Sequence, residues 1–408
     1  MTRKVTRRRV VYIPGYDPIH PRRYRELYRK EGAAQAAISG YEIALQAGQG
    51  GGTYGWQVTG RIDGVETRTD VEVLVWSDIV RDSMGQSIPA TYVALARTAW
   101  VYIGSGALWR LMRLRKGPVI AALYPVAFLI LQLFVAIGLG WGAGALANAA
   151  MAATGLDIAA PWTGMVLALG VAVAALRWFK ARDNRFFAYY LMHDYAFSAR
   201  SRGANPPELE ARMAVFGDAI AGALSGEVDE VLVVGHSSGA HIAVSVLADL
   251  IRAGRVPEDG PELSFLSLGQ VVPMVAFLPG ADRLRADLRY LSEQDVLSWV
   301  DVTAPGDGCA FALCDPVAVS GQAGPGKLWP LVISAAFTQT LSPERWRALR
   351  WRFFRLHFQY LCAFDRVGDY DYFRITAGPM TLGARFADRQ PSKSRIEAPV
   401  SKYKSVAA

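Results

Sequence analysis

Two long apolar runs constrain the fold of this chain more than any other feature. Residues 118–150 are almost free of charge, and a shorter apolar run covers residues 161–176. A membrane-spanning helix needs roughly 20 apolar residues, and inside a bilayer only helices and closed barrels satisfy every backbone polar group. Because a short loop joins the two runs, they predict two antiparallel helices that cross a membrane as a hairpin, with the bilayer contacting residues 118–176.

Positive charges flank this hairpin on one side of the predicted membrane. They are Arg113, Arg115 and Lys116 before the first run, and Arg177, Lys180 and Arg182 after the second. Cytoplasmic segments next to membrane helices carry an excess of Lys and Arg. The sequence therefore predicts an integral membrane protein whose remaining domain lies on the cytoplasmic side. The alternative is a pair of buried core helices or a hydrophobic lid.

The rest of the composition narrows the class of protein. The 408 residues are 52% hydrophobic and carry a net charge of +8, part of it in a basic start that includes Arg7, Arg8 and Arg9. We interpret this start as an arm for an anionic membrane surface, since no nucleic-acid-binding module is recognisable. Three cysteines form no disulfide framework and complete no metal site, which is typical of a reducing compartment. No secretory signal peptide is recognisable.

Hydrophobic patterns outside the hairpin predict alternating strands and helices. The predicted strands are 8–14, 56–62, 70–77, 229–234, 263–268 and 297–303. The predicted helices are 22–45, 183–224 with a break at 205–207, 239–253, and a helix-rich region at 343–362. From about Phe386 the chain is polar and rich in Pro, Ser and Lys, which predicts a disordered tail. The fold class is therefore α/β, a mostly parallel sheet flanked by helices, with the inserted transmembrane hairpin.

One motif carries the chemistry. Gly235-His-Ser237-Ser238-Gly239 lies between the apolar strand 229–234 and an amphipathic helix. This strand–Gly-x-Ser-x-Gly–helix context is that of a nucleophile elbow, in which a strained turn lifts the serine hydroxyl above the sheet edge. Gly235 and Gly239 meet the need for small residues around the turn. Ser237 is the candidate nucleophile, at a helix N-terminus that favours developing negative charge. The alternative is a structural turn.

The loop after the first strand is a candidate oxyanion hole. In Val10-Val-Tyr-Ile-Pro-Gly15-Tyr16-Asp-Pro18, Gly15 allows a close backbone approach and the N–H of Tyr16 is the expected donor. The second donor would be the backbone N–H of Ser238, directly after the nucleophile. A plain Pro-Gly β-turn is the alternative.

Elimination selects the histidine. In this type of site the chain order is serine, acid, histidine. Of the five histidines only His241 and His357 lie downstream of Ser237, and His241 follows it by four residues within the same helix. His357, in the aromatic run 353–361, is therefore the candidate general base.

The acid is less constrained by the sequence. It should lie in a turn after the strand at 298–303, and Asp307 in Ala304-Pro-Gly-Asp-Gly308 has that position. Asp315 is the second candidate, and Asp301, within the strand, is the third. The acid has to reach the histidine in order to orient its imidazole.

These motifs resemble the α/β-hydrolase superfamily, in its lipase and esterase branch. The resemblance implies a Ser237–His357–Asp307 triad, an acyl-enzyme mechanism, and an oxyanion hole of the Ser238 and Tyr16 N–H groups. It implies no metal and no organic cofactor. The oxyanion strand starts near residue 9, so we expect the first two strands of the usual sheet to be missing, which predicts a reduced sheet.

The expected organisation is a hydrolase domain interrupted by the hairpin. Residues 1–112 and 183–385 would form the two parts of that domain, residues 113–182 the hairpin, and residues 386–408 the disordered tail. The expected substrate is an acyl ester, lipidic because of the membrane, and a thioesterase or acyltransferase would use the same triad. The alternative function is an inactive hydrolase fold that serves as a binding or assembly scaffold.

Two further glycine-rich motifs carry less weight. Residues 321–327 match the spacing of a phosphate-binding loop, but Leu328 replaces the expected Ser or Thr, and Pro325 removes an amide that should contact phosphate. Residues 50–55 match a dinucleotide pattern, but they precede a strand instead of following one. We interpret both as loops.

Overall fold

The computed structural model describes residues 4–47, 54–154 and 160–407. The chain divides into two compact units. Unit 1 contains Met1–Asp82, Tyr102–Val119 and Ser201–Ala408, and unit 2 contains Ser83–Val101 and Ile120–Arg200. Unit 2 therefore includes nearly all of the expected hairpin, and it also contains residues 83–101 and 183–200, which the sequence analysis assigned to the hydrolase domain.

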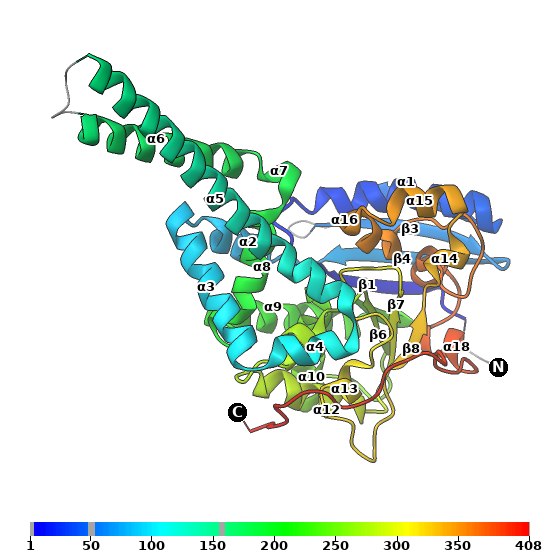
Figure 1. Cartoon of the computed structure of the whole chain (residues 1–408). Helices are drawn as coiled ribbons and strands as arrows, with labels where there is room; N and C mark the ends of the chain where they lie inside the picture. The colour runs from blue at the N-terminus through cyan, green and yellow to red at the C-terminus, as the bar shows by residue number, and fades with distance from the viewer. Residues whose placement is uncertain (1–3, 48–53, 155–159, 408) are drawn as a thin grey trace. The chain divides into compact units, whose positions relative to one another are not determined.

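Unit 1 is built on an eight-stranded, mostly parallel sheet (Figure 1). The strands are β1(Arg7–Ile13), β2(Glu42–Ala47), β3(Tyr54–Ile62), β4(Val65–Val73), β5(Glu230–His236), β6(Glu262–Leu268), β7(Leu297–Thr303) and β8(Leu331–Ser334). Their order is β2-β3-β4-β1-β5-β6-β7-β8. Only the β2–β3 and β3–β4 pairs are antiparallel. The α/β class is thus confirmed, whereas the expectation of a reduced sheet is wrong.

The antiparallel edge of the sheet forms because its sequence provides a tight hairpin. Ile62 pairs with Val65 across the two residues Asp63 and Gly64, which both have positive φ, 53° and 73°. Asp-Gly is a preferred pair for such a turn, whose twist matches that of the flanking strands. Along β3 the residues alternate between buried and more exposed positions, so one face of this edge is part of the core.

The predicted helix at 22–45 is too long. Helix α1(Arg22–Ser39) ends at Gly40, which has φ of 72° and donates its backbone N–H to the Ala36 carbonyl. Glycine adopts this left-handed conformation without steric cost and commonly terminates helices. The following residues form β2, which pairs with β3. The sequence analysis missed this strand because Ile43 and Leu45 also continue the helical spacing.

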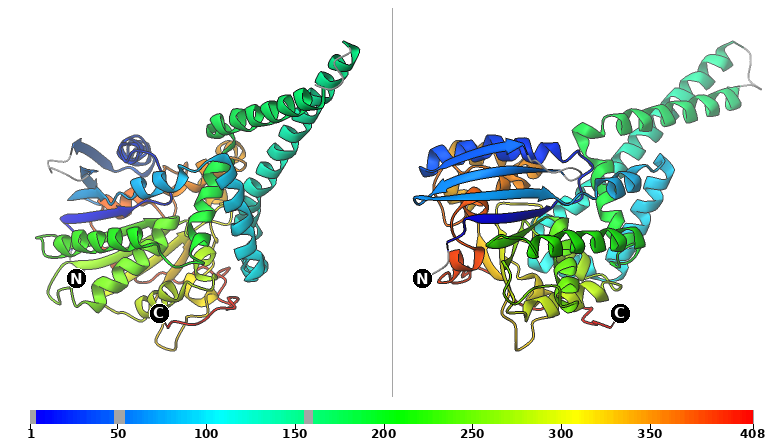
Figure 2. Two further views of the ribbon diagram at one scale, coloured as in Figure 1. Left: turned by 90° about the vertical axis from the view of Figure 1, so that its left-hand side faces the viewer. Right: turned by 180° about the vertical axis from the view of Figure 1, so that it is seen from behind.

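Helices cover both faces of the sheet (Figure 2). Besides α1, the helices that lie wholly or mainly in unit 1 are α2(Ser77–Met84), α4(Ala107–Leu114), α9(Pro207–Leu224), α10(Ser238–Arg252), α11(Val272–Ala276), α12(Asp282–Ser292), α13(Pro316–Val319), α14(Phe337–Thr340), α15(Pro343–Leu349), α16(Phe353–His357), η1(Gln359–Leu361), α17(Tyr372–Ala377) and α18(Leu382–Phe386). Helices α9 and α10 contact β5, while α1 and α17 contact the antiparallel edge.

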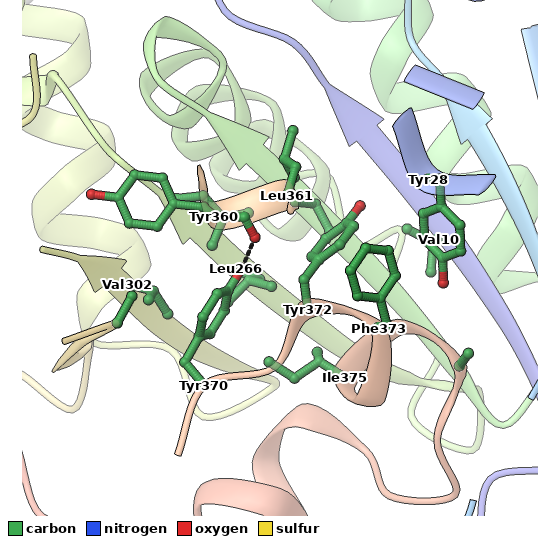
Figure 3. Close-up of a cluster of buried hydrophobic side chains, with 14 of the residues drawn as sticks. Val10, Tyr28, Leu266, Val302, Tyr360, Leu361, Tyr370, Tyr372, Phe373 and Ile375 are labelled. Atoms are coloured by element: carbon green, nitrogen blue, oxygen red, sulfur yellow. Dashed lines mark hydrogen bonds between the residues drawn. The ribbon is translucent and has the colours of Figure 1, made fainter. Parts of the chain in front are cut away.

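Tyrosines and aliphatic residues form the core between α1, the C-terminal helices and one face of the sheet (Figure 3). Val10, Leu266 and Val302 come from three strands, and Tyr360 and Tyr370 lie beside them. The Tyr370 hydroxyl donates to the Tyr360 carbonyl at 2.7 Å. Buried tyrosines require such partners, so this core is held by directional bonds as well as by apolar burial.

Unit 2 contains the two candidate membrane helices. Its helices are α3(Ile88–Gly104) and α5(Lys116–Ala153), which both also reach into unit 1, and α6(Ala160–Ala181), α7(Asp183–Phe186) and α8(Ala188–Arg200). Helices α5 and α6 are long and apolar enough to cross a membrane. Their most apolar windows are only 22% and 6% buried, unlike those of a soluble core helix. A methyl group at Gly144 would lie 2.7 Å from the Gly164 carbonyl oxygen, so the two helices pack closely.

Both ends of the chain differ from the sequence predictions. Arg8, interpreted as part of a basic arm, belongs to β1, where its buried side chain binds Glu230. Arg3 lies outside the described residues. The tail expected to be disordered from about Phe386 lies against unit 1: Ile396 forms a parallel bridge with Cys314, and the Val400 amide donates to the Val319 carbonyl at 3.0 Å. Backbone pairing of this kind is not visible in hydrophobic periodicity.

Candidate active site

The strand–turn–helix around Ser237 has the strained geometry that the motif predicts. Ser237 links β5 to α10 and has φ of 57° and ψ of −121°. A positive φ is unfavourable for residues with a side chain and persists where the surroundings enforce it. The Ser237 amide donates to the carbonyl of Leu268, at the end of β6, at 2.9 Å. The side chain is half-buried, so the hydroxyl is held at the carboxyl edge of the sheet.

Both glycines of the elbow are required by close backbone contacts. A methyl group at Gly239 would overlap the Ile13 carbonyl oxygen and lie 2.7 Å from that of Pro14. A methyl group at Gly235 would lie 2.8 Å from the Cα of Ala240. Helix α10 thus approaches both its own strand and the end of β1 too closely for any side chain.

The predicted oxyanion loop lies directly against the nucleophile. A methyl group at Gly15 would be 2.9 Å from Ser237 Cβ and 3.2 Å from the His236 carbonyl oxygen. Trp76 Nε1 donates to the Pro14 carbonyl at 2.9 Å, and the edge of the buried Tyr16 ring packs on Trp76. The loop carrying the Tyr16 amide is therefore next to Ser237 and anchored by an indole.

Asp17 fixes the second half of this loop. Its carboxylate accepts hydrogen bonds from the Ile19 amide at 3.0 Å and from the Tyr24 hydroxyl, and Arg23 forms an ion pair with it at 3.3 Å. Because three groups from α1 and the loop converge on one carboxylate, the backbone after Gly15 has a defined conformation.

The predicted acid and base are hydrogen-bonded to each other. His357 Nδ1 lies 2.7 Å from Asp307 Oδ2, and both side chains are almost completely buried. A carboxylate only accepts hydrogen bonds, so Nδ1 carries the proton and Nε2 is left as the basic nitrogen. Nε2 is buried and has no hydrogen-bond partner in the described part of the chain.

His357 lies close to the elbow without a hydrogen bond to Ser237. Its ring is 4.9 Å from that of His236, the residue before the nucleophile. The Leu268 carbonyl accepts the Ser237 amide, and the next residue is Gly269. A methyl group at Gly269 would be 3.0 Å from His357 Cε1. Catalytic hydrogen bonds are commonly long in ligand-free structures and tighten when substrate binds.

Tyr360 is a site residue that the sequence analysis missed. Its hydroxyl donates to Asp307 Oδ2 at 3.0 Å and accepts the Ala304 amide at 2.9 Å. Asp307 Oδ1 also accepts the Cys309 amide at 2.8 Å. Burial, and then the charge of Asp307, raise the pKa of Tyr360 well above its usual range, so the phenol stays protonated as a donor. Its position three residues after His357 in an aromatic run was the available signal.

His236 is the second residue that sequence reasoning missed. Its Nε2 lies 3.0 Å from the backbone carbonyl of His357, and a carbonyl accepts, so Nε2 donates. Burial, with a smaller contribution from His357, holds the pKa of His236 well below its usual range. A neutral His236 thus positions the backbone of His357 from the elbow itself.

The two alternative acids occupy other sites. Asp315 caps α13 by accepting the Val317 amide at 2.9 Å, and it pairs with Lys327 at 2.8 Å. Asp301, in β7, accepts the Ser267 hydroxyl at 2.6 Å. Burial raises the pKa of Asp301 to about 8, so this carboxyl is largely neutral near neutral pH. Among the three candidates, the structure brings Asp307 to His357.

Asp307, Cys309 and His357 could also be considered as a metal site. Each offers one potential ligand atom, and these atoms lie within 4.8 Å of one another. However, His357 Nδ1 and Asp307 Oδ2 already bind each other at 2.7 Å, and a metal taking both atoms would break that bond. We therefore interpret the pair as an acid–base unit. The three cysteines form no disulfide, and burial raises the pKa of Cys314 to about 12, which makes it an unreactive thiol.

The two glycine-rich motifs set aside earlier do not contribute to this site. Residues 321–327 connect α13 to β8, and Gly321 has φ of 74°. A phosphate-binding loop would instead lead from a strand into a helix. Most of the motif at 50–55 lies outside the described residues.

Comparison with known proteins leaves the site to be interpreted on its own geometry. No protein-family model, no curated protein and no solved structure matches the chain.

Proposed function

We propose that this protein is a membrane-anchored serine hydrolase that cleaves acyl esters. The observation that carries the proposal is the buried Asp307–His357 hydrogen bond of 2.7 Å beside a serine at φ of 57°. The carboxylate selects the tautomer in which His357 Nε2 accepts a proton.

The proposed reaction follows from these groups. Ser237 Oγ attacks the ester carbonyl carbon while His357 Nε2 takes the hydroxyl proton, and the Ser238 and Tyr16 amides bind the resulting oxyanion. The protonated His357, stabilised by Asp307, then gives its proton to the leaving alcohol, and an acyl-serine forms. A water molecule, deprotonated by His357, attacks the acyl-serine, and the return of the proton to Ser237 releases the carboxylic acid.

We further propose an α/β-hydrolase-like fold. An eight-stranded, mostly parallel sheet with helices on both faces supports it, as does the chain order Ser237, Asp307, His357. In the sheet, β1, the strand before the oxyanion loop, pairs directly with β5, the strand before Ser237. The β2–β4 segment occupies the sheet edge beyond β1.

A lipid substrate and a cytoplasmic catalytic domain complete the proposal. The two membrane helices would keep the protein where hydrophobic esters concentrate, which supports a lipidic acyl ester over a soluble one. Basic residues lie at the start of α5 and at the end of α6. By the positive-inside rule these two helix ends face the cytoplasm. The same triad would serve a thioesterase or an acyltransferase, which differ in the group that leaves or accepts the acyl chain.

A non-catalytic scaffold is the second candidate, because His357 Nε2 makes no hydrogen bond to Ser237 in this conformation. A fluorophosphonate probe separates the two, since it reacts with serines activated by a base. Membranes containing wild type and Ser237→Ala are labelled side by side, with Ser245→Ala, a buried serine on α10, as the matched control. Labelling of wild type and the control but not of Ser237→Ala supports the hydrolase. Unlabelled, folded wild type would support the scaffold.

A further inference from the structure

The chain segment just before His357 has an unusual surface. Helices α15 and α16 pack together in unit 1 (Figure 1). Their exposed residues combine arginines with large aromatic side chains: Arg347, Arg350, Trp351, Arg352, Phe353 and Arg355. We call this set the Arg–Trp patch. Trp351 is 73% exposed and Phe353 is 42% exposed, so two of the largest apolar side chains of the segment face solvent.

The positive charge of the Arg–Trp patch is mostly not neutralised. Arg350, Arg352 and Arg355 form no ion pair with any described residue, and the Arg350 guanidinium lies 5.6 Å from the Trp351 ring centre. Neighbouring Arg345, outside the patch, pairs with Asp365 at 3.0 Å. Arg345 therefore stabilises the fold, whereas Arg350, Arg352 and Arg355 are available to bind an external anion.

The patch is in contact with the turn that carries the catalytic acid. A methyl group at Gly308 would be 2.9 Å from the Phe353 ring. One at Gly306 would be 2.5 Å from the Trp346 indole. Both glycines flank Asp307, so this turn is covered by the aromatic side of α15 and α16.

The beginning of the first membrane helix reaches the same turn. Gly117 belongs to unit 1 and is the second residue of α5. A methyl group on Gly117 would lie 3.3 Å from the Gly308 Cα. Helix α5 continues from this turn into the candidate membrane span, so unit 1 is tethered to any bilayer that α5 crosses.

We propose that the Arg–Trp patch docks unit 1 on an anionic phospholipid surface. Tryptophan prefers the membrane interface, where its ring is among acyl chains and its N–H remains hydrated. Arginines beside it bind lipid phosphates with paired N–H groups. A nucleic acid would also attract the charge, but the exposed apolar ring of Trp351 and the tether that α5 provides to a bilayer favour a lipid surface.

The consequence for the active site rests on the proposed hydrolase function. Phe353 and His357 are one helical turn apart on α16, so docking would bring the segment that carries His357 to the headgroup region. The substrate would then be an ester of a membrane lipid, with an anionic headgroup held by the patch.

The test measures lipid contact without relying on catalysis. The full-length protein is reconstituted in nanodiscs of phosphatidylcholine alone or mixed with phosphatidylserine, and hydrogen–deuterium exchange of residues 345–356 is followed by mass spectrometry. Each basic residue near an anionic surface strengthens attraction roughly fivefold. Anionic lipid should therefore protect this segment in wild type. The triple variant Arg350→Gln, Arg352→Gln, Arg355→Gln, whose local attraction falls by roughly 100-fold on the same scale, should lose the protection.

A matched triple variant controls for the loss of charge. Arg29→Gln, Arg61→Gln, Arg68→Gln removes exposed arginines from α1, β3 and β4 and should keep the protection. Equal exchange in neutral and anionic nanodiscs, or equal behaviour of the two triple variants, would overturn the proposal, as would protection by RNA but not by lipid. Ser237→Ala should be protected like wild type, so failure of the hydrolase proposal and failure of the docking proposal are distinguishable.

Discussion

Replacing Asp307 by asparagine is the most informative single change in this protein. The side chain keeps its shape, but one of its two oxygens becomes an N–H donor. Asp307 Oδ2 accepts from His357 and Tyr360, and Oδ1 accepts from the Cys309 amide. Whichever way the amide is turned, a donor will face a donor.

The two orientations have different costs. If the asparagine NH2 faces His357, Nδ1 has to accept, the proton moves to Nε2, and His357 can no longer take a proton from Ser237. If the NH2 faces Cys309 instead, the backbone N–H there loses its buried partner, which costs about 1–3 kcal/mol. The first orientation instead leaves the buried Tyr360 hydroxyl without its acceptor. Each orientation therefore breaks one buried hydrogen bond, and in both the negative charge that stabilises protonated His357 is lost. The variant should be folded, less stable, and poor at activating Ser237.

The expected loss of reactivity is large. The same isosteric change in a Ser-His-Asp triad lowers kcat by about 10⁴, which corresponds to about 5.5 kcal/mol in activation free energy. We expect Asp307→Asn to react with a fluorophosphonate probe slower by a similar factor. The assay is the time course of labelling at several probe concentrations, with thermal unfolding in the same detergent to show that the variant is folded.

Asp315→Asn is the matched control, because Asp315 is also buried and was the second candidate acid. Asparagine keeps the helix cap, so the variant should lose about 1–3 kcal/mol of stability through the lost ion pair with Lys327 and label at the wild-type rate. The reasoning is refuted if Asp307→Asn labels normally, or if Asp315→Asn loses labelling while it stays folded.

Three further outcomes are expected for the fold. Gly239→Ala should destabilise the protein by about 3 kcal/mol in thermal unfolding because the new methyl overlaps backbone, whereas Gly217→Ala, with open space around it, should not. Arg8→Met should cost about 3–5 kcal/mol, because it leaves the Glu230 charge buried without its partner, and adding Glu230→Gln should restore part of the lost stability. Burial raises the pKa of Asp301 to about 8 in the folded protein. Between the unfolded pKa and about 8, the unfolded chain has lost this proton while the folded protein keeps it. The free energy of unfolding should therefore fall as pH rises through that window. Asp301→Asn should flatten that part of the stability–pH curve, and an unchanged slope would assign it to other groups.

Sequence reasoning is most specific where a structure depends on neighbouring residues. The elbow needs an apolar strand, a serine between two glycines and an amphipathic helix, and all three lie within 229–253. The span-length helices follow from their composition in the same way. His357 could be chosen because the order of triad residues along the chain left one histidine.

Only the tertiary structure decided which groups meet. Asp301, Asp307 and Asp315 all lie near the end of one strand, and the pairing of Asp307 with His357 depends on α16, which is distant in the chain. The same holds for Tyr360 on Asp307, for Arg8 buried against Glu230, and for the tail residue Ile396 beside Cys314. Each of these contacts joins segments far apart in sequence, and its free energy depends on burial and hydrogen-bond geometry. Local pattern and composition determine helices, turns and spans, but they contain no information on those distances.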